Sequence, residues 1–264
     1  MSGLSDFLIR RGKGALDLWR TWRAIFSFAG KALAAALTPS VYNSATRMVV
    51  MKQIYFTAWQ ILLPFSLFAG LLSYVVIQIV VSTAREYGLS EYALEMSMRV
   101  LVPEILPLVT ALFIALRSSS AINTEVALMR IHNEIDALEA AGVDTLRMEF
   151  MPRVIGGVVS LLALTAINSV LALVLAYIAL YGFQLWSLPD FTRVMGQVFD
   201  LGIIIGLWVK CVAFGLAVTV IPVAEGLATP RMLFMAPISV LRGMVRLFFV
   251  LMFIEVASLA LKYM

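Results

Sequence analysis

Five stretches of mostly apolar residues follow one another from residue 54 onwards, and each is close to the length that crosses a bilayer. They cover residues 54–81, 100–116, 154–181, 201–224 and 247–261. Spanning the hydrocarbon core takes roughly 20 such residues in a helix. Hydrophobic residues make up 62% and charged residues 14% of the 264 positions, whereas roughly 25% of a soluble domain is charged. We therefore predict an all-α integral membrane protein with five transmembrane helices, its transmembrane domain occupying residues 54–264.

Two of these stretches differ from a plain apolar helix. The second is short and contains Pro103 and Pro107. Proline lacks a backbone N–H and crowds the preceding turn, so this helix is expected to be kinked or broken. The fifth begins earlier, near Ile238, if Arg242 and Arg246 lie inside protein or extend to the interface.

The first 53 residues form a separate, basic region. Between residues 5 and 37, apolar residues such as Trp22 and Phe26 recur at roughly helical spacing, with Arg and Lys between them. A basic amphipathic helix that carries tryptophan is typical of helices lying in the membrane interface. We predict an interfacial helix here, with packing on a partner's surface as the alternative.

The connecting segments alternate in basic charge. Segments 1–53 and 117–153 hold eight and four Lys or Arg residues, whereas segments 82–99 and 182–200 hold two and one. Basic residues concentrate on the cytoplasmic side of membrane proteins. The N-terminus and the loop 117–153 are therefore predicted to be cytoplasmic, and the C-terminus lies on the other side.

Several classes of function are disfavoured. A single cysteine, Cys211, and a single histidine, His132, exclude a disulfide framework and argue against a Cys-based or His-rich metal site and a Ser-His-Asp triad. The sequence contains no G-x-x-x-x-G-K-[ST] phosphate-binding loop. The formal net charge of +4 is modest and gives no indication of nucleic-acid binding. We expect a non-catalytic membrane subunit without metal or cofactor.

The loop 117–153 is the one long polar segment between spans. Ser120 or Asn123 is a candidate helix start and Gly142 a candidate stop. Between them, apolar residues share a face, so the pattern predicts an amphipathic helix over about 120–141. The same pattern serves two uses: docking on a soluble partner, or covering the protein's own cytoplasmic end.

Ionisable and polar residues within the spans form a second group of candidates. Lys210 lies near the middle of the fourth span, and Glu104 and Glu255 lie in the second and fifth. Charges at such depth usually face protein or water, so these residues either gate a cavity, meet a lipid headgroup or form a buried ion pair. On the first span, one helical face carries apolar residues, a tyrosine and a glutamine, suitable for a lipid path or for ordinary packing: Leu71, Tyr74, Val75 and Gln78.

A longer pattern spans residues 100–226. It keeps, in order, Glu104, Pro107, Arg117, Ala121-Ile122, Glu125, Met129, Ile135-Asp136-Ala137-Leu138, Gly142-Val143-Asp144, Pro152-Arg153, Gly206-Leu207, Lys210 and Gly226. In this pattern the chain resembles the MlaE/YrbE-type permeases, the membrane subunits of MCE-associated ABC transporters that move phospholipids or other hydrophobic molecules. Segment 227–249 departs from the family's small-residue sequence.

The resemblance implies a function and a set of partners. It implies a permease of the bacterial inner membrane that couples ATPase motion to a lipid cavity. The partners would be cytoplasmic ABC ATPase subunits, a second permease copy, identical or not, a hexameric MCE-domain protein outside, and a phospholipid substrate. Two alternatives are a scaffold or heteromeric partner subunit of such a complex and an ATP-independent secondary transporter.

The resemblance also assigns the polar loop to coupling with the ATPase. The residues expected to do this comprise charged side chains and two apolar anchors: Arg117, Glu125, Met129, Arg130, Glu134, Asp136, Leu138 and Glu139.

Overall fold

Five long helices lie side by side in the structure, a computed structural model that describes residues 22–263 except 24, 33, 35–43 and 90–91. Each is long and apolar enough to cross a membrane: Thr46–Glu86, Ala93–Ile131, Leu146–Tyr181, Leu201–Leu227 and Met235–Lys262. The described residues form helices, turns and bends, with no strand among them. The predicted all-α membrane protein with five spanning helices is confirmed.

The helices are assembled from α-helical and π-helical sections. The first comprises α2 (Ser44–Ile54), η2 (Tyr55–Trp59) and α3 (Gln60–Glu86), and the second comprises α4 (Ala93–Val100), η4 (Leu101–Ile105), α5 (Leu106–Ile114), η5 (Ala115–Ser119) and α6 (Ser120–Ile131). The third comprises η6 (Leu146–Phe150) and α8 (Met151–Tyr181), and the last two are α10 (Leu201–Leu227) and α11 (Met235–Tyr263). The first helix thus begins before residue 54. The fifth helix, α11, begins at Met235, which agrees with the early start near Ile238 that was predicted if Arg242 and Arg246 lie inside protein.

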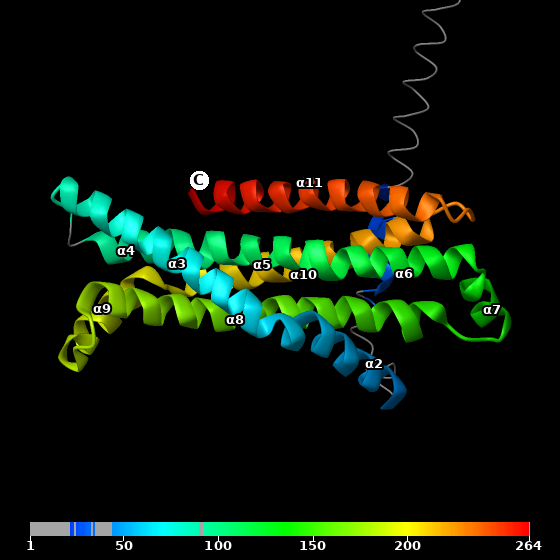
Figure 1. Ribbon diagram of the computed structural model, residues 1–264, viewed down its shortest axis with the longest axis horizontal. Helices are drawn as coiled ribbons and strands as arrows, with labels where there is room; N and C mark the ends of the chain where they lie inside the picture. Colours follow the sequence, from blue (N-terminus) through cyan, green and yellow to red (C-terminus); the bar gives the residue numbers. More distant parts are fainter. Residues whose placement is uncertain (1–21, 24, 33, 35–43, 90–91, 264) are drawn as a thin grey trace, which may run out of the picture.

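α10 is the centre of the bundle. It packs against α8 on one side and against α11 and α6 on the other, and Figure 1 shows α10 running between α11 and α8. Glycine permits a close approach of two backbones here, because a Cβ on Gly215 of α10 would lie 2.8 Å from the Cα of Val158 on α8. The largest cluster of buried apolar side chains lies along these contacts.

Of the kink or break expected at Pro103 and Pro107, the break is wrong. The second helix widens into the π-helical turn η4 around Pro103, and Pro107 follows in the first turn of α5. A wider turn accommodates a residue that cannot donate a backbone hydrogen bond. The carbonyl of Pro103, four residues before Pro107, accepts a hydrogen bond from Lys210 Nζ instead. The chain therefore stays helical from Ala93 to Ile131.

The predicted single helix over 120–141 is also wrong. α6 continues the second spanning helix without a new start, and the chain turns at Asn133, whose φ is 59°. A short helix, α7 (Glu134–Ala140), follows. The stop predicted at Gly142 is confirmed, because Gly142 has a φ of 79°, which glycine adopts without strain.

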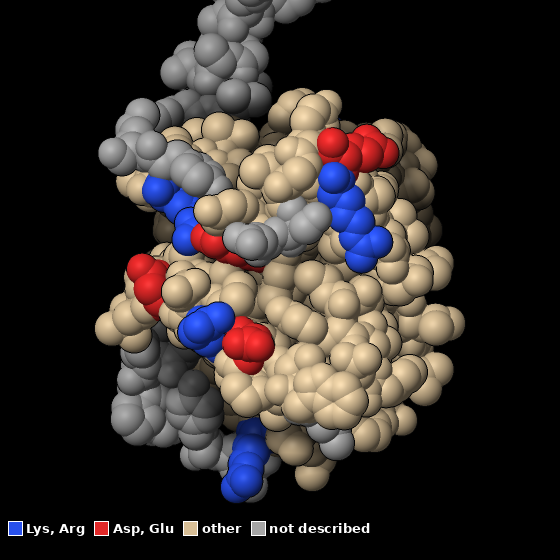
Figure 2. Space-filling view, turned by 90° about the vertical axis from the view of Figure 1, so that its left-hand side faces the viewer, with Lys and Arg blue, Asp and Glu red and all other residues tan. Residues whose placement is uncertain are grey.

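The two ends of the bundle differ. α2, α6 and α7 lie at one end, called here the α7 end (Figure 1). At the other, the α9 end, lie α4, the C-terminal end of α11, η7 (Leu185–Ser187) and α9 (Leu188–Val198). Figure 2 shows the α9 end, where basic and acidic side chains are scattered beside one another; Arg99 pairs with Glu95 at 2.9 Å.

The predicted interfacial helix over residues 5–37 lies mostly outside the described residues. Of that segment, residues 25–32 are helical, with Ile25 and Ala32 buried against the bundle. The ring of Phe28 meets that of Phe150 edge-on, with centroids 6.0 Å apart. The placement of this segment in a membrane interface stays a prediction.

Candidate functional site

The three ionisable residues that the sequence placed inside spans meet in one cluster. Lys210 of α10 points its ammonium group towards η4 and α11. Its Nζ contacts the carboxylate of Glu104, lies 3.2 Å from that of Glu255 and donates a hydrogen bond of 3.1 Å to the carbonyl of Pro103. All three charged residues are buried, at 4% to 8% exposure. A charge at this depth is costly unless it is paired, so each of the three depends on the others.

Lys262, near the end of α11, is a fourth member that the sequence argument missed. Its Nζ lies 2.8 Å from Glu104 Oε1, which brings the cluster to two cations and two anions. The signal was present, because Lys262 follows Glu255 at i+7 and therefore lies on the same helical face. The cluster is electrically balanced, as burial requires.

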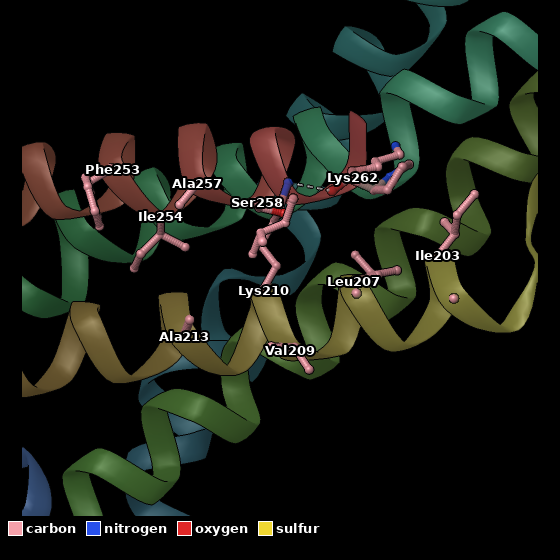
Figure 3. Close-up of a pocket in the computed structure, with 14 residues that line it drawn as sticks. Ile203, Leu207, Val209, Lys210, Ala213, Phe253, Ile254, Ala257, Ser258 and Lys262 are labelled. Atoms are coloured by element: carbon pink, nitrogen blue, oxygen red, sulfur yellow. Dashed lines mark hydrogen bonds between the residues drawn. The ribbon is translucent and has the colours of Figure 1, made fainter. Parts of the chain in front are cut away.

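A cavity of about 530 Å³ opens beside this cluster, between α10 and α11. Figure 3 shows Lys210 rising from α10 towards α11, with Phe253, Ile254 and Ala257 lining the wall opposite. The lining is mainly apolar, and Lys210 and Lys262 are its charged residues. An apolar cavity with a few polar groups at one point is the usual form of a small-molecule site.

A larger groove of about 860 Å³ runs between α3 and α8. Of the predicted lipid-path residues, Leu71 and Tyr74 line it, whereas Val75 and Gln78 are exposed on α3 outside it. Gly70 forms part of its floor. The Ser66 hydroxyl is buried in this groove and has no hydrogen-bond partner among the described residues.

Charged side chains hold α7 to the bundle. The carboxylate of Asp136 accepts a 2.8 Å hydrogen bond from Arg130 of α6 and also contacts Arg231, from the turn between α10 and α11. Ile135 is the buried residue of α7. Besides Asp136, three other residues of α7 belong to the predicted coupling set. Glu134 and Glu139 are exposed, and Leu138 is half-buried.

The remaining predicted coupling residues lie on the second spanning helix. Glu125 is exposed and accepts a 3.0 Å hydrogen bond from the buried Arg153 of α8. Met129 is half-buried against a small apolar cluster that includes Ile135. Arg117, in η5, reaches away from α7 to the first spanning helix. The structure thus brings most of the set together around α6 and α7 and sets Arg117 apart.

A second buried charge network was not anticipated from the sequence. Glu225, near the end of α10 and 2% exposed, contacts Arg246 of α11 and lies 3.7 Å from Arg242. Next to it, the Asn123 amide of α6 donates a 3.4 Å hydrogen bond to the carbonyl of Ser239. Two arginines spaced i, i+4 in an apolar helix were the signal, because such charges need a buried partner.

Comparison with known proteins identifies the family. A profile of the family described as Permease MlaE matches residues 50–261, which covers all five spanning helices. The chain belongs to the MlaE permease family. The match includes the Glu104–Lys210–Glu255 cluster, the α3–α8 groove and the α6–α7 segment.

Individual members of the MlaE family are similar along most of their length. The intermembrane phospholipid transport system permease protein MlaE of Haemophilus influenzae is 29% identical over 234 residues, which cover 84% of each chain. Proteins described as probable ABC transporter permeases from Rickettsia felis and Rickettsia typhi are 25% and 26% identical over 209 residues. These matches cover 77% of this chain and 76% of each relative.

Proposed function

We propose that this protein is the membrane permease subunit of an ABC transporter that moves phospholipid, or another hydrophobic lipid, between the bacterial inner membrane and an MCE-protein conduit. Membership of the MlaE permease family carries the proposal. The Haemophilus relative is described as part of an intermembrane phospholipid transport system, and the Rickettsia relatives as ABC transporter permeases. ATP hydrolysis belongs to a separate subunit.

The proposed orientation puts the N-terminus and the α7 end in the cytoplasm. The excess of Lys and Arg in segments 1–53 and 117–153 supports it. ABC ATPase subunits then meet the α7 end, and a hexameric MCE-domain protein meets the α9 end. A second permease copy, identical or related, completes the membrane part.

The α3–α8 groove supports a lipid path. Its volume, about 860 Å³, lies within the roughly 300–1,000 Å³ of typical ligand sites, and its walls are apolar side chains suited to acyl chains. The phenol of Tyr74, an exposed residue, offers a polar contact for an ester or glycerol group. Val75 and Gln78 extend the same exposed surface of α3.

The buried cluster supports a gate. Lys210, Glu104 and Glu255 tie the second, fourth and fifth spanning helices at one point beside the α10–α11 cavity. Helices tied by buried charges separate only if those charges find new partners. Rearrangement of this cluster would therefore accompany opening of the cavity.

The α6–α7 segment supports coupling to the ATPase. Glu134 and Glu139 present exposed carboxylates, while Asp136, Arg130 and Ile135 anchor α7 to the bundle. Glu125, Met129 and Leu138 border the same surface, and Arg117 would transmit its motion to the first span. Glu134→Lys is the cleanest probe, because no Lys or Arg of the described residues pairs with Glu134.

Reversal of this charge should weaken copurification of the ATPase by about a hundredfold or more, since like charges facing each other across an interface cost several kcal/mol. Glu86→Lys, at the opposite end of the bundle, is the matched control and should have no effect. Full stoichiometry and ATPase activity in the Glu134→Lys complex would remove α7 from the proposed coupling surface.

Purification with the natural neighbours in mild detergent, followed by mass spectrometry of proteins and lipids, tests the proposal as a whole. Recovery of an ATPase, an MCE-domain protein and phospholipid is the expected result. A chain without ATPase that still moves lipid in vesicles would make it a secondary transporter instead.

Gly70→Leu distinguishes a transporting subunit from a scaffold. A Cβ at Gly70 would lie 3.2 Å from Leu171 Cδ2, so the leucine side chain would occupy the α3–α8 groove. Assembly with the ATPase should persist while lipid transport falls. Gly196→Leu on α9, where a Cβ would meet nothing within 4 Å, is the control. Undiminished transport in Gly70→Leu would favour the scaffold function.

A further inference from the structure

A polar pocket of about 410 Å³ lies near the α7 end, between the first and second spanning helices, and the groove and the buried cluster do not use it. Gln53, Phe56 and Gln60 line one wall. Arg117, Ala121 and Glu125 line the other. The pocket is therefore built from two helices that meet where both are π-helical, at η2 and η5. π-helical turns within α-helices are frequent at functional sites.

Arg117 is the cation of this pocket, and only part of its hydrogen-bonding capacity is used. Nη1 donates a 2.8 Å hydrogen bond to the carbonyl of Phe56, and Nη2 donates one of 2.8 Å to Gln60 Oε1. A guanidinium has five N–H donors, so three remain. Among the described residues, no carboxylate pairs with Arg117. Glu125, at the other end of the pocket, is engaged by Arg153.

The sequence around the pocket indicates the depth where lipid headgroups meet the hydrocarbon core. Arg117 directly follows the apolar stretch 100–116. On the neighbouring helix, Tyr55 and Trp59 are 52% and 68% exposed, and such aromatic residues are enriched at this level of the membrane. A guanidinium held at headgroup depth, with unused donors and no carboxylate beside it, is suited to a phosphate group.

We propose that this pocket binds the phosphate group of a glycerophospholipid from the leaflet at the α7 end, with Arg117 as the phosphate ligand. The proposed orientation is needed only to identify this leaflet as the cytoplasmic one. It is separate from the α3–α8 groove, whose lining residues are apolar or carry hydroxyl groups. The phosphate would bridge the first and second spanning helices, because the same guanidinium already joins η5 to η2.

Native mass spectrometry of the full chain, titrated with phosphatidylglycerol, tests the proposal. Arg117→Gln should weaken the tightest lipid adduct by about tenfold or more, the usual effect of losing a charge-assisted hydrogen bond. Arg85→Gln, an exposed arginine at the other end of the same bundle, should leave that adduct unchanged. Arg117→Lys keeps a cation in the pocket but loses the paired contacts with Phe56 and Gln60, and should retain the lipid better than Arg117→Gln.

Competition identifies the recognised group. Inorganic phosphate in excess should displace the lipid, whereas diacylglycerol with the same chains should not bind at this affinity. Equal binding of diacylglycerol, or an Arg117→Gln variant with wild-type affinity, would overturn the proposal. Equal loss of the adduct in Arg117→Lys and Arg117→Gln would do so too, because it would assign Arg117 to holding the helices alone. None of these outcomes depends on an ATPase, so they are independent of the transporter proposal.

Discussion

Replacing Lys210 by methionine is the most direct test of the buried charge cluster. Methionine has a similar length and fits an apolar wall, so the substitution removes charge with little change in volume. It leaves the carboxylate of Glu255 without its cation, because Lys210 is the one basic partner of Glu255 among the described residues. Glu104 keeps Lys262 at 2.8 Å.

The expected loss follows from burial. Lys210 and Glu255 are 2% and 10% exposed at their side chains, and removal of one partner from such a pair costs about 3–5 kcal/mol. In a chain of this size that loss corresponds to a melting temperature lower by about 10 °C. The same substitution at Lys262, whose side chain is 23% exposed, should cost about 1 kcal/mol, because solvent screens the pair.

Thermal unfolding of the purified variants in detergent measures these losses. The double variant Lys210→Met/Glu255→Gln should recover most of the stability, since a buried pair replaced as a whole is close to neutral. Lipid transport by the same double variant then separates two roles. Recovered stability without recovered transport would assign the charges to gating. A Lys210→Met variant as stable as the wild type would refute the reasoning.

Three further substitutions test other contacts of the bundle. Gly215→Ala should lower the free energy of unfolding by about 1–3 kcal/mol, measured by thermal unfolding, because its Cβ would lie 2.8 Å from the Val158 backbone; unchanged stability would show that α8 and α10 are less closely packed. Arg246→Met should cost less than the roughly 3–5 kcal/mol of an unpaired buried charge, because Glu225 loses its closest cation but keeps Arg242 at 3.7 Å. Glu225→Gln in the same chain should restore stability. Arg231→Gln should speed hydrogen exchange of the α7 amides and leave exchange in α10 unchanged, because Arg231 contacts Asp136 of α7. Equal protection of α7 in the wild type and in Arg231→Gln would contradict this.

The spanning helices could be predicted from the sequence because apolar length is a strong local signal. The continuity of the second helix could not. Pro103 signals a local conflict with an α-helix, but whether the chain breaks or widens its turn depends on packing against α10 and α11, which is not a local property. In the same way, the turn at Asn133 requires a left-handed backbone conformation, which asparagine adopts more readily than most residues. The residues around it nevertheless have the apolar pattern of one amphipathic helix.

The site was predictable one residue at a time but not as an arrangement. Depth within a span marked Lys210, Glu104 and Glu255 as needing partners, and the structure shows that they partner one another. The spacing of residues along the sequence does not fix the relative heights of the second, fourth and fifth helices. The ion pairs between them could therefore not be predicted from the sequence. Arg117 was assigned to the coupling surface because it belongs to the family pattern in the polar loop, while its contacts are with the first helix.

Continuity of the second spanning helix bears on how the proposed coupling would work. The helix is 39 residues long, or about 58 Å at 1.5 Å per residue. It carries Glu104 of the buried cluster towards one end and Arg130, which holds α7, at the other. A displacement of α7 would therefore be transmitted along one hydrogen-bonded element to the cluster. A helix broken at Pro103 would separate the two. The π-helical turns η4 and η5 lie next to Glu104 and Arg117, so any local change of helical register is expected at these two contacts and not between them.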